Sequence, residues 1–230
     1  MGDFSVYLRF LSQDLSEDHV GRTQEPSAET LSVTTARLEA FSDGVIAVAA
    51  TLLVLNITVP TLSSGETLLH GLLAQWPKYF AYIVSFSTIG IIWINHHAMI
   101  SRLREADRTI LLLNLLLLMA IAVLPFATSL MATYLKEGRY ANLAAGVYAG
   151  SFLVMSLAFS ALNRHILIGK AHLLGVDLDE ARRRQILARS VAGISPYAIA
   201  TAVAVVSPYV TVAICGAIAI FYALPIASGG

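Results

Sequence analysis

The sequence predicts an all-α membrane protein with six transmembrane helices per subunit. Hydrophobic residues make up 57% of the 230-residue chain, charged residues only 13%, and the mean hydropathy is +0.71. Stretches that are apolar enough to cross a bilayer core as helices of about 20 residues recur along the whole chain. They cover roughly residues 38–59, 77–97, 109–133, 141–165, 190–207 and 208–226.

The distribution of basic residues predicts the orientation of these helices. Short cytoplasmic loops carry an excess of Lys and Arg. With the N-terminus inside, the outside retains three basic residues, Lys78, Lys136 and Arg139. Twelve lie inside: Arg9, Arg22, Arg37, Arg102, Arg104, Arg108, Arg164, Lys170, Arg182, Arg183, Arg184 and Arg189. We therefore expect both termini to face the cytoplasm. The formal net charge of zero gives no electrostatic reason to expect nucleic acid as a partner.

The chain divides into a polar tail and one membrane domain. Residues 1–35 mix acids and hydroxyls with a few apolar residues and lack the compact apolar core of a signal peptide. We expect them to form a mobile cytoplasmic tail, with residues 36–230 forming the six-helix domain. The longest outside loop runs from Thr61 to Gly71, and Pro196 is expected to kink the fifth span. The single Cys215 is best interpreted as a small buried hydrophobe.

The first span carries an apolar stripe. At roughly 100° per residue, Leu52, Leu55 and Thr51 lie within about 60° of Val48 on the helix surface. Asp43 lies about 140° away from Val48, on a face of small residues that permits close helix packing in lipid. The two faces are therefore expected to serve different purposes.

Asp43 stands where this span begins and needs a partner. An ionisable residue at the centre of a membrane helix costs about 2.5–3.5 kcal/mol, and less near an end. The second span ends in Trp93, His96 and His97, at the same expected depth. We expect Asp43 to pair with His96 or His97, with Trp93 packed one turn below and Arg37 nearby. A structural clamp is the simplest account.

Two motifs resemble a known family. The first span starts with Arg37-x-x-x-Phe41-Ser42-Asp43, and the second ends with Trp93-x-x-His96-His97. With the six-span plan, they look like the bacterial relatives of the lysosomal potassium channel called transmembrane protein 175. The likeness covers most of the chain from about Arg37 to Pro225, although the later spans carry no matching motif.

The resemblance implies a homotetramer in which four first helices line a central pore for potassium and other monovalent cations. A hydrophobic constriction replaces the carbonyl-lined filter, and its first ring falls on Val48, where relatives carry Ile or Leu. Leu52 and Leu55 follow on the next turns, and Thr51 is the candidate for selectivity. Alternatively, the Thr51 hydroxyl only bonds back to a carbonyl one turn before. In that family the Phe-Ser-Asp and Trp/His residues hold the helices together.

Two other classes of function, a secondary transporter and an enzyme, fit the sequence less well. A proton-coupled secondary transporter would use Asp43 and His96 or His97 as a relay, but carriers usually show repeats with broken helices that meet at the membrane midplane. An enzyme is not indicated, because no nucleophile with a base and no metal-binding cluster appears; we expect no catalytic residue, metal site or cofactor. Gly146-Val147-Tyr148-Ala149-Gly150 resembles a filter loop superficially, yet helix packing through the two glycines is the better interpretation.

The expected partners are further copies of the chain, membrane lipid and the permeant cations, and the expected location is the bacterial plasma membrane.

Overall fold

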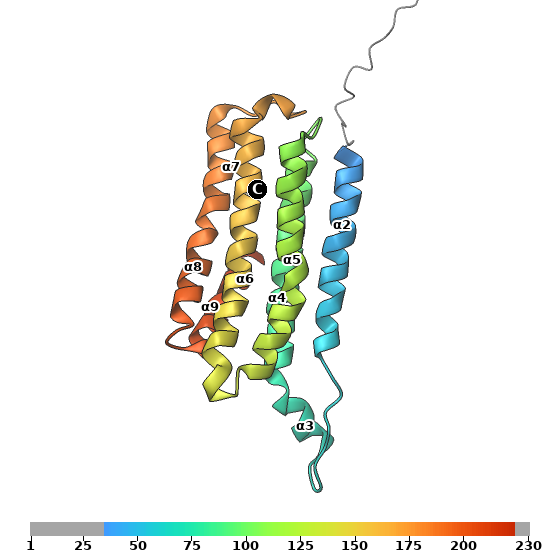
Figure 1. The fold of residues 1–230 in the computed structure, drawn as a ribbon, viewed down its shortest axis with the longest axis vertical. Coiled ribbons are helices and arrows are strands. Elements are labelled where there is room, and N and C mark those ends of the chain that lie inside the picture. The colour runs from blue at the N-terminus through green and yellow to red at the C-terminus, as the bar shows by residue number, and fades with distance from the viewer. Residues whose placement is uncertain (1–34, 224–230) are drawn as a thin grey trace, which may run out of the picture. The chain divides into compact units, whose positions relative to one another are not determined.

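The computed structural model describes residues 35–223, which form a bundle of long helices (Figure 1). Contacts between residues divide the chain into residues 1–32 and residues 33–230, and the described part belongs to the second unit. Apart from Thr35, which already lies in the first described helix, the expected tail falls outside the described residues.

The described residues form these elements in chain order: α2 (Thr35–Leu52), the 3-10 turn η1 (Leu53–Asn56), α3 (Leu68–Ala74), α4 (Trp76–Ile100), α5 (Arg108–Tyr134), α6 (Gly138–Arg164), the π-helical turn η2 (His165–Gly169), the 3-10 turn η3 (Ala171–Leu173), α7 (Glu180–Ala192), α8 (Ile194–Val203) and α9 (Pro208–Ala223). Five helical stretches are long and apolar enough to cross a membrane: Thr35–Asn56, Trp76–Ile100, Arg108–Tyr134, Gly138–Gly169 and Glu180–Val203. The shorter apolar helix α9 follows them and occupies the position of the sixth predicted span.

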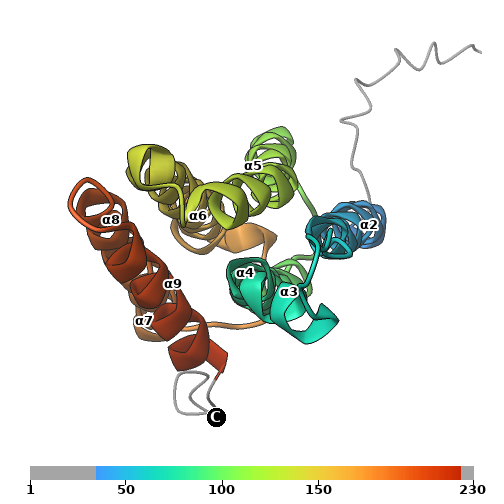
Figure 2. The ribbon, with the colours of Figure 1, turned by 90° about the horizontal axis from the view of Figure 1, so that it is seen from below.

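The helix α6 forms the centre of the bundle, and α2 lies at its edge (Figure 2). α6 contacts α5, α7, α8 and α9, whereas α2 contacts α4 and α5. Tyr148 and Phe152 of α6 are fully buried, and Phe152 also packs against Tyr197 of α8 at 5.5 Å between ring centres. A Cβ atom at Gly146 would lie 3.7 Å from Ala204, the C-cap of α8, and one at Gly150 would lie 3.9 Å from Thr201 of α8, so the predicted role of these glycines in helix packing is confirmed.

The first helix ends earlier than its apolar run. The α-helix stops at Leu52, a 3-10 turn continues to Asn56, and Ile57 is extended. Three β-branched residues, 57–59, precede Pro60, and both features disfavour the helix. The expected boundary at residue 59 was therefore too late.

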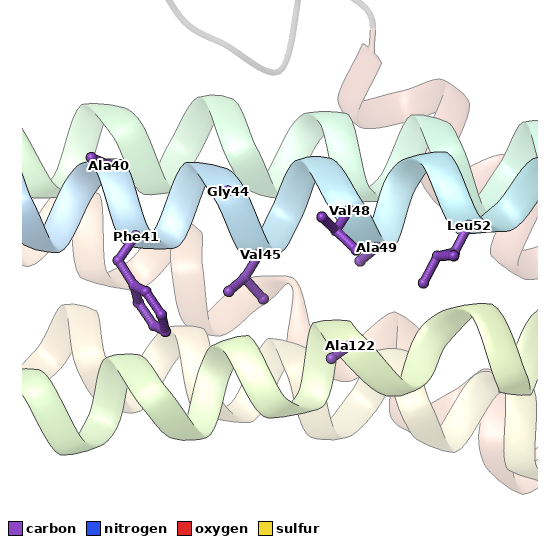
Figure 3. A pocket seen from close by; sticks show the side chains of 8 residues that line it. All are labelled: Ala40, Phe41, Gly44, Val45, Val48, Ala49, Leu52 and Ala122. Atoms are coloured by element: carbon purple, nitrogen blue, oxygen red, sulfur yellow. The ribbon is translucent and has the colours of Figure 1, made fainter.

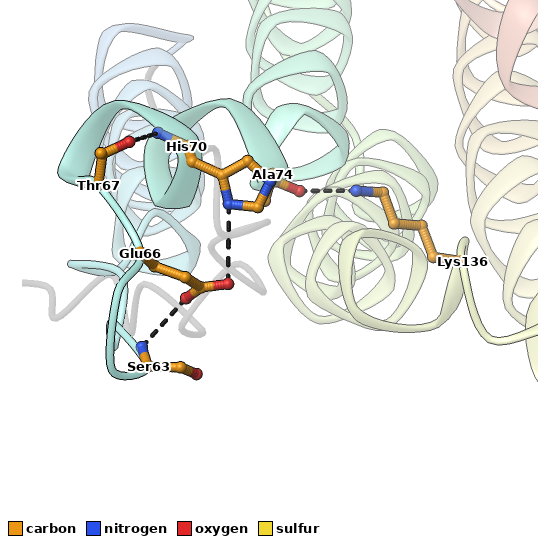
Figure 4. Close-up of polar contacts among 6 residues, drawn as sticks. All are labelled: Ser63, Glu66, Thr67, His70, Ala74 and Lys136. Carbon is orange, nitrogen blue, oxygen red and sulfur yellow. Dashed lines mark hydrogen bonds and ion pairs between the residues drawn. The ribbon is translucent and has the colours of Figure 1, made fainter.

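The connection after residue 60 also contains a helix that the sequence reading missed. Thr67 caps α3 by accepting a hydrogen bond from the backbone N–H of His70 at 3.3 Å, and Glu66 lies 3.7 Å from the His70 ring (Figure 4). Lys136, just beyond α5, donates a 2.7 Å hydrogen bond to the carbonyl of Ala74. These contacts tie α3 to the end of the bundle where α4 begins.

The fifth predicted span begins ten residues earlier than expected. The helical stretch starts at Glu180, after Asp179 caps it, and the arginine triplet 182–184 lies on α7 rather than in a loop. The break falls at Gly193, three residues before Pro196. Proline cannot bond to the carbonyl four residues before it and clashes with that carbonyl, so the interruption appears at residues 192–193.

Candidate functional site on the first helix

The helix α2 has one buried face and one exposed face. Its buried residues recur three or four positions apart, as expected for a helix that packs along one side, and they are Leu38, Ser42, Ile46 and Ala49. Within the described part of the chain, α2 packs mainly against α4 and α5, and its opposite face is exposed.

The predicted pore residues lie on this exposed face. Val48 is 57% exposed although its side chain is aliphatic, and Leu52, Leu55 and Thr51 are also exposed. Leu55 belongs to the 3-10 turn, where the chain advances about 120° per residue, so the helical wheel does not apply to it. It nevertheless remains on the outside of the helix.

An apolar groove of about 510 Å³ runs beside this stripe, between α2 and α5 (Figure 3). The side chains of Phe41 and Val45 point from α2 towards α5, which contributes the small Ala122. Val48 and Leu52 extend the same lining along α2. We call these residues the α2 groove: Ala40, Phe41, Gly44, Val45, Val48, Ala49, Leu52 and Ala122.

Thr51 donates its hydroxyl hydrogen to the carbonyl oxygen of Val48 at 2.9 Å. The sequence analysis gave this bond, to a carbonyl one turn before, as the alternative to a role in selectivity. The bond fixes the direction of the hydroxyl hydrogen. The lone pairs of the oxygen stay exposed, because a donating hydroxyl keeps its acceptor capacity. The bond is therefore compatible with a role in contacting a cation.

A buried chain of hydrogen bonds holds α2 against α4 and α5. Ser42 donates to the carbonyl of Leu38 at 2.8 Å and accepts from Asn114 Nδ2 at 2.9 Å. The amide oxygen of Asn114 then faces Nε2 of His96 at 2.8 Å. Because this oxygen can only accept, Nε2 carries the proton. The chain ends at His96 Nδ1, which is buried and has no partner among the described residues.

Two further polar pairs join α2 to α4. Trp93 Nε1 donates a 2.9 Å hydrogen bond to Oδ1 of Asp43, and His97 Nδ1 lies 2.6 Å from Oε1 of Glu39. The structure therefore gives Asp43 a different partner from the predicted His96 or His97. His96 turns inward to α5, and His97 reaches the acid one turn before Asp43. The side chain of Arg37 forms no hydrogen bond or ion pair with residues 35–223.

We call these side chains the α2 latch: Glu39, Ser42, Asp43, Trp93, His96, His97 and Asn114. Sequence reasoning missed Asn114 and Glu39. Asn114 is the one polar side chain in the run Ile110–Met119, where a buried amide in a membrane helix needs partners, so this signal was available. For Glu39 the signal was weaker, since an acid at a helix start is common.

Comparisons with known proteins identify a family and several similar chains. The family described as endosomal/lysosomal potassium channel TMEM175 matches residues 37–125, which include α2, α4 and most of α5. A potassium channel of Streptomyces collinus is 43% identical over 186 residues, covering 81% of this chain and 90% of the relative. A potassium channel of Chamaesiphon minutus is 40% identical over 192 residues, covering 83% and 94%.

One solved structure and one human relative are also similar to this chain. The crystal structure of a lysosomal potassium-selective channel TMEM175 homolog from Chamaesiphon minutus superimposes with a TM-score of 0.74 at 37% identity, covering 85% of this chain and 98% of that one. The human endosomal/lysosomal proton channel TMEM175 is 36% identical over 111 residues, which are 45% of this chain and 22% of the human protein. These relatives show that the chain belongs to the TMEM175 family.

Proposed function

We propose that the protein is a potassium-permeable cation channel in which four copies of the chain place their α2 helices around a central pore. The observation that carries this proposal is the exposed stripe of α2, in which the aliphatic side chains of Val48, Leu52 and Leu55 are 57%, 43% and 69% exposed. Bacterial relatives of nearly the same length are named potassium channels, which supports the same conclusion.

The position of α2 at the edge of the bundle suits such an assembly. The α2 groove is lined entirely by small, aliphatic and aromatic side chains. In a homotetramer, residues of the neighbouring α2 would fill this groove, and Val48 would approach the axis. Small residues such as Ala40 and Gly44 allow helices to approach closely in lipid, where packing drives association.

The pore in this proposal closes by dewetting. A ring of apolar side chains repels water when it is narrow, and a slight widening lets hydrated or partly hydrated ions through. Val48 forms the first ring, and Leu52 and Leu55 form the following ones. Selectivity needs oxygen atoms, because apolar rings cannot replace a hydration shell. Thr51 presents its oxygen lone pairs beside Val48 and takes this role.

The transporter alternative receives no support from the contacts. A relay needs groups that exchange protons in sequence, and Asp43 is instead bonded to the indole N–H of Trp93. An indole nitrogen only donates hydrogen bonds. Protons could also cross through the pore itself, without any relay. The human relative is named a proton channel, so proton flux is measured separately.

We propose that both chain termini face the cytoplasm of a bacterial cell. The helix end with Arg102, Arg104 and Arg108 would then lie at the inner surface, in line with the excess of basic residues there. At the opposite end, Lys136 lies 5.8 Å from the centre of the Trp76 ring. Tryptophan and lysine at a helix end are typical of the membrane interface.

The test is a recording from the purified protein in a planar bilayer, with potassium on one side and sodium on the other. We expect single-channel steps and a reversal potential close to the potassium equilibrium potential. A second recording with a pH gradient and impermeant buffer ions measures proton flux. Transport without single-channel steps would indicate a carrier and overturn the proposal.

A further inference from the structure

The short helix α3 carries a row of leucines at the bundle end where α4 begins. At roughly 100° per residue, these leucines fall within a stripe about 140° wide on one side of the helix. Their exposed fractions are 55%, 67%, 39% and 64% in chain order, and no residue of α3 is buried. We call these residues the leucine stripe: Leu68, Leu69, Leu72 and Leu73.

The opposite side of α3 faces its own connecting segment. A Cβ atom at Gly71 would lie 2.8 Å from Leu62 and 3.0 Å from Pro60, so the preceding loop passes close to this side of the helix. His70 also lies on this side, with its ring 3.7 Å from the carboxylate of Glu66 (Figure 4). The helix therefore has one face held by the chain and one exposed face made of leucine alone.

Two contacts of one lysine place α3 at the membrane interface. Lys136 donates a 2.7 Å hydrogen bond to the carbonyl of Ala74, the last residue of α3. Its Nζ also lies 5.8 Å from the centre of the Trp76 ring, where α4 begins. Tryptophan at a helix end marks the boundary between water and hydrocarbon. Because α3 is only about 10 Å long and ends two residues before Trp76, it stays close to this boundary.

At this depth the leucine stripe suits lipid as its partner. Interfacial helices bury their apolar side chains about 5–10 Å into the boundary between headgroups and acyl chains. Leucine offers aliphatic surface without a donor or acceptor, whereas contact surfaces between proteins are enriched in aromatic residues and arginine. The ammonium group of Lys136, next to the end of α3, can in addition donate charge-assisted hydrogen bonds to lipid phosphate.

We propose that α3 is an interfacial anchor whose leucine stripe inserts into the outer leaflet of the bilayer. The inserted stripe would hold the connection between α2 and α4 at a fixed depth. It would thereby fix the outer end of the helix that lines the proposed pore. The choice of the outer leaflet rests on the proposed membrane orientation, and the insertion itself does not.

The experiment measures the depth of single nitroxide labels on the purified full chain in phosphatidylcholine vesicles. Leu69→Cys and Leu73→Cys carry the label on the leucine stripe, and His70→Cys carries it on the opposite side of the same helix. The native Cys215 is fully buried, and the parent protein treated with the same label provides the blank. Collisions with oxygen, which concentrates in hydrocarbon, and with a water-soluble nickel complex report the depth of each label.

We expect the labels at positions 69 and 73 to lie about 5–10 Å below the lipid phosphates and to collide mainly with oxygen. The label at position 70 should lie at the phosphates or above and collide mainly with the nickel complex. Equal exposure of all three labels to nickel would place α3 in water and overturn the proposal.

Shielding of the labels at positions 69 and 73 from both reagents would also overturn it, because protein, such as a neighbouring copy of the chain, would then cover the stripe. Leu69 and Leu73 are 67% and 64% exposed, so both variants are expected to fold, and either one alone decides the outcome. The measurement uses no ion flux, so a failure here leaves the channel proposal unaffected.

Discussion

Trp93 on α4 donates a hydrogen bond of 2.9 Å from its indole Nε1 to the carboxylate Oδ1 of Asp43 on α2. A hydrogen bond to a charged group contributes about 1.5–3 kcal/mol net, and less where water competes, as it does at this exposed pair. The contact explains how a carboxylate is tolerated at the start of an apolar helix without a basic partner. It also favours a structural role for Asp43.

The first prediction concerns this pair. Trp93→Phe and Asp43→Ala should each destabilise the protein, and the double variant should lose less than the sum, with a coupling of about 1 kcal/mol. Thermal unfolding of all four proteins measures this coupling. Asp43→Asn, which keeps an acceptor, should assemble normally and keep its pH response. Strictly additive losses would show that the bond contributes nothing, and an Asp43→Asn protein that lost only its pH dependence would favour a relay.

The second prediction concerns Asn114, which joins Ser42 to His96. Asn114→Leu should destabilise the protein by about 2–6 kcal/mol, because two buried polar groups lose their partner at about 1–3 kcal/mol each. Asn95→Ala is the matched control, since the Asn95 amide is exposed and bonds to its own helix. Chemical denaturation in detergent gives both values. Equal losses for the two variants would contradict the latch.

The third prediction concerns the gate. Val48→Asn should wet the constriction and raise cation flux, measured by single-channel recording or a vesicle flux assay. Ile83→Asn on α4 is the control, because Ile83 is 60% exposed against 57% for Val48 and lies off α2. Leu53, which the wheel places off the stripe, is fully buried and would disturb folding. Higher flux from Ile83→Asn than from Val48→Asn would show that the pore face is assigned wrongly.

The fourth prediction concerns Thr51. Thr51→Val keeps the shape and removes the oxygen, so the preference for potassium over sodium should fall while conduction persists. Thr51→Ser should restore the preference, because it keeps the hydroxyl that bonds to Val48. Thr201→Val removes a comparable back-bonded hydroxyl on α8 and should change nothing. An unchanged reversal potential in Thr51→Val would leave the residue with a structural role alone.

The fifth prediction concerns pH. Burial raises the pKa of Asp107, but the hydrogen bond from the Ile110 N–H and the contacts with His165 and Lys170 outweigh it, so the pKa lies below its ordinary 3.8. The stabilisation is therefore present above about pH 4 and is lost as the pH falls through the lower folded value. Asp107→Asn keeps a capping oxygen but loses the charge that pairs with Lys170 and His165, so it should be less stable by about 0.2–1 kcal/mol at pH 7. At pH 3 the difference should shrink, and an undiminished difference would contradict this account.

The sequence predicted the helical membrane architecture and the family motifs correctly, because apolar runs of bilayer length and two spaced motifs are local signals. Family membership and the placement of Gly146 and Gly150 in helix packing followed from such signals. Helical periodicity grouped Val48 and Leu52 on one stripe, and both are exposed. It did not identify the packed face, because the small-residue face was expected to include Ala47 and Val54, which are exposed, whereas the buried face runs through Ile46 and Ala49. The features that were predicted correctly require no knowledge of which helices become neighbours.

The partners within the latch were decided by the tertiary structure. Asp43, His96 and His97 share a depth, but a shared depth does not say which side chain faces which helix. Rotation of α4 about its axis turns His96 to Asn114 on α5 and leaves the Asp43 carboxylate to Trp93. Likewise, only the packing of the loops pairs Leu103 with Leu174, which lies 71 residues later in the chain. Contacts between distant segments depend on how each helix is rotated about its axis and on how the loops pair. Neither produces a periodic pattern of residues in the sequence.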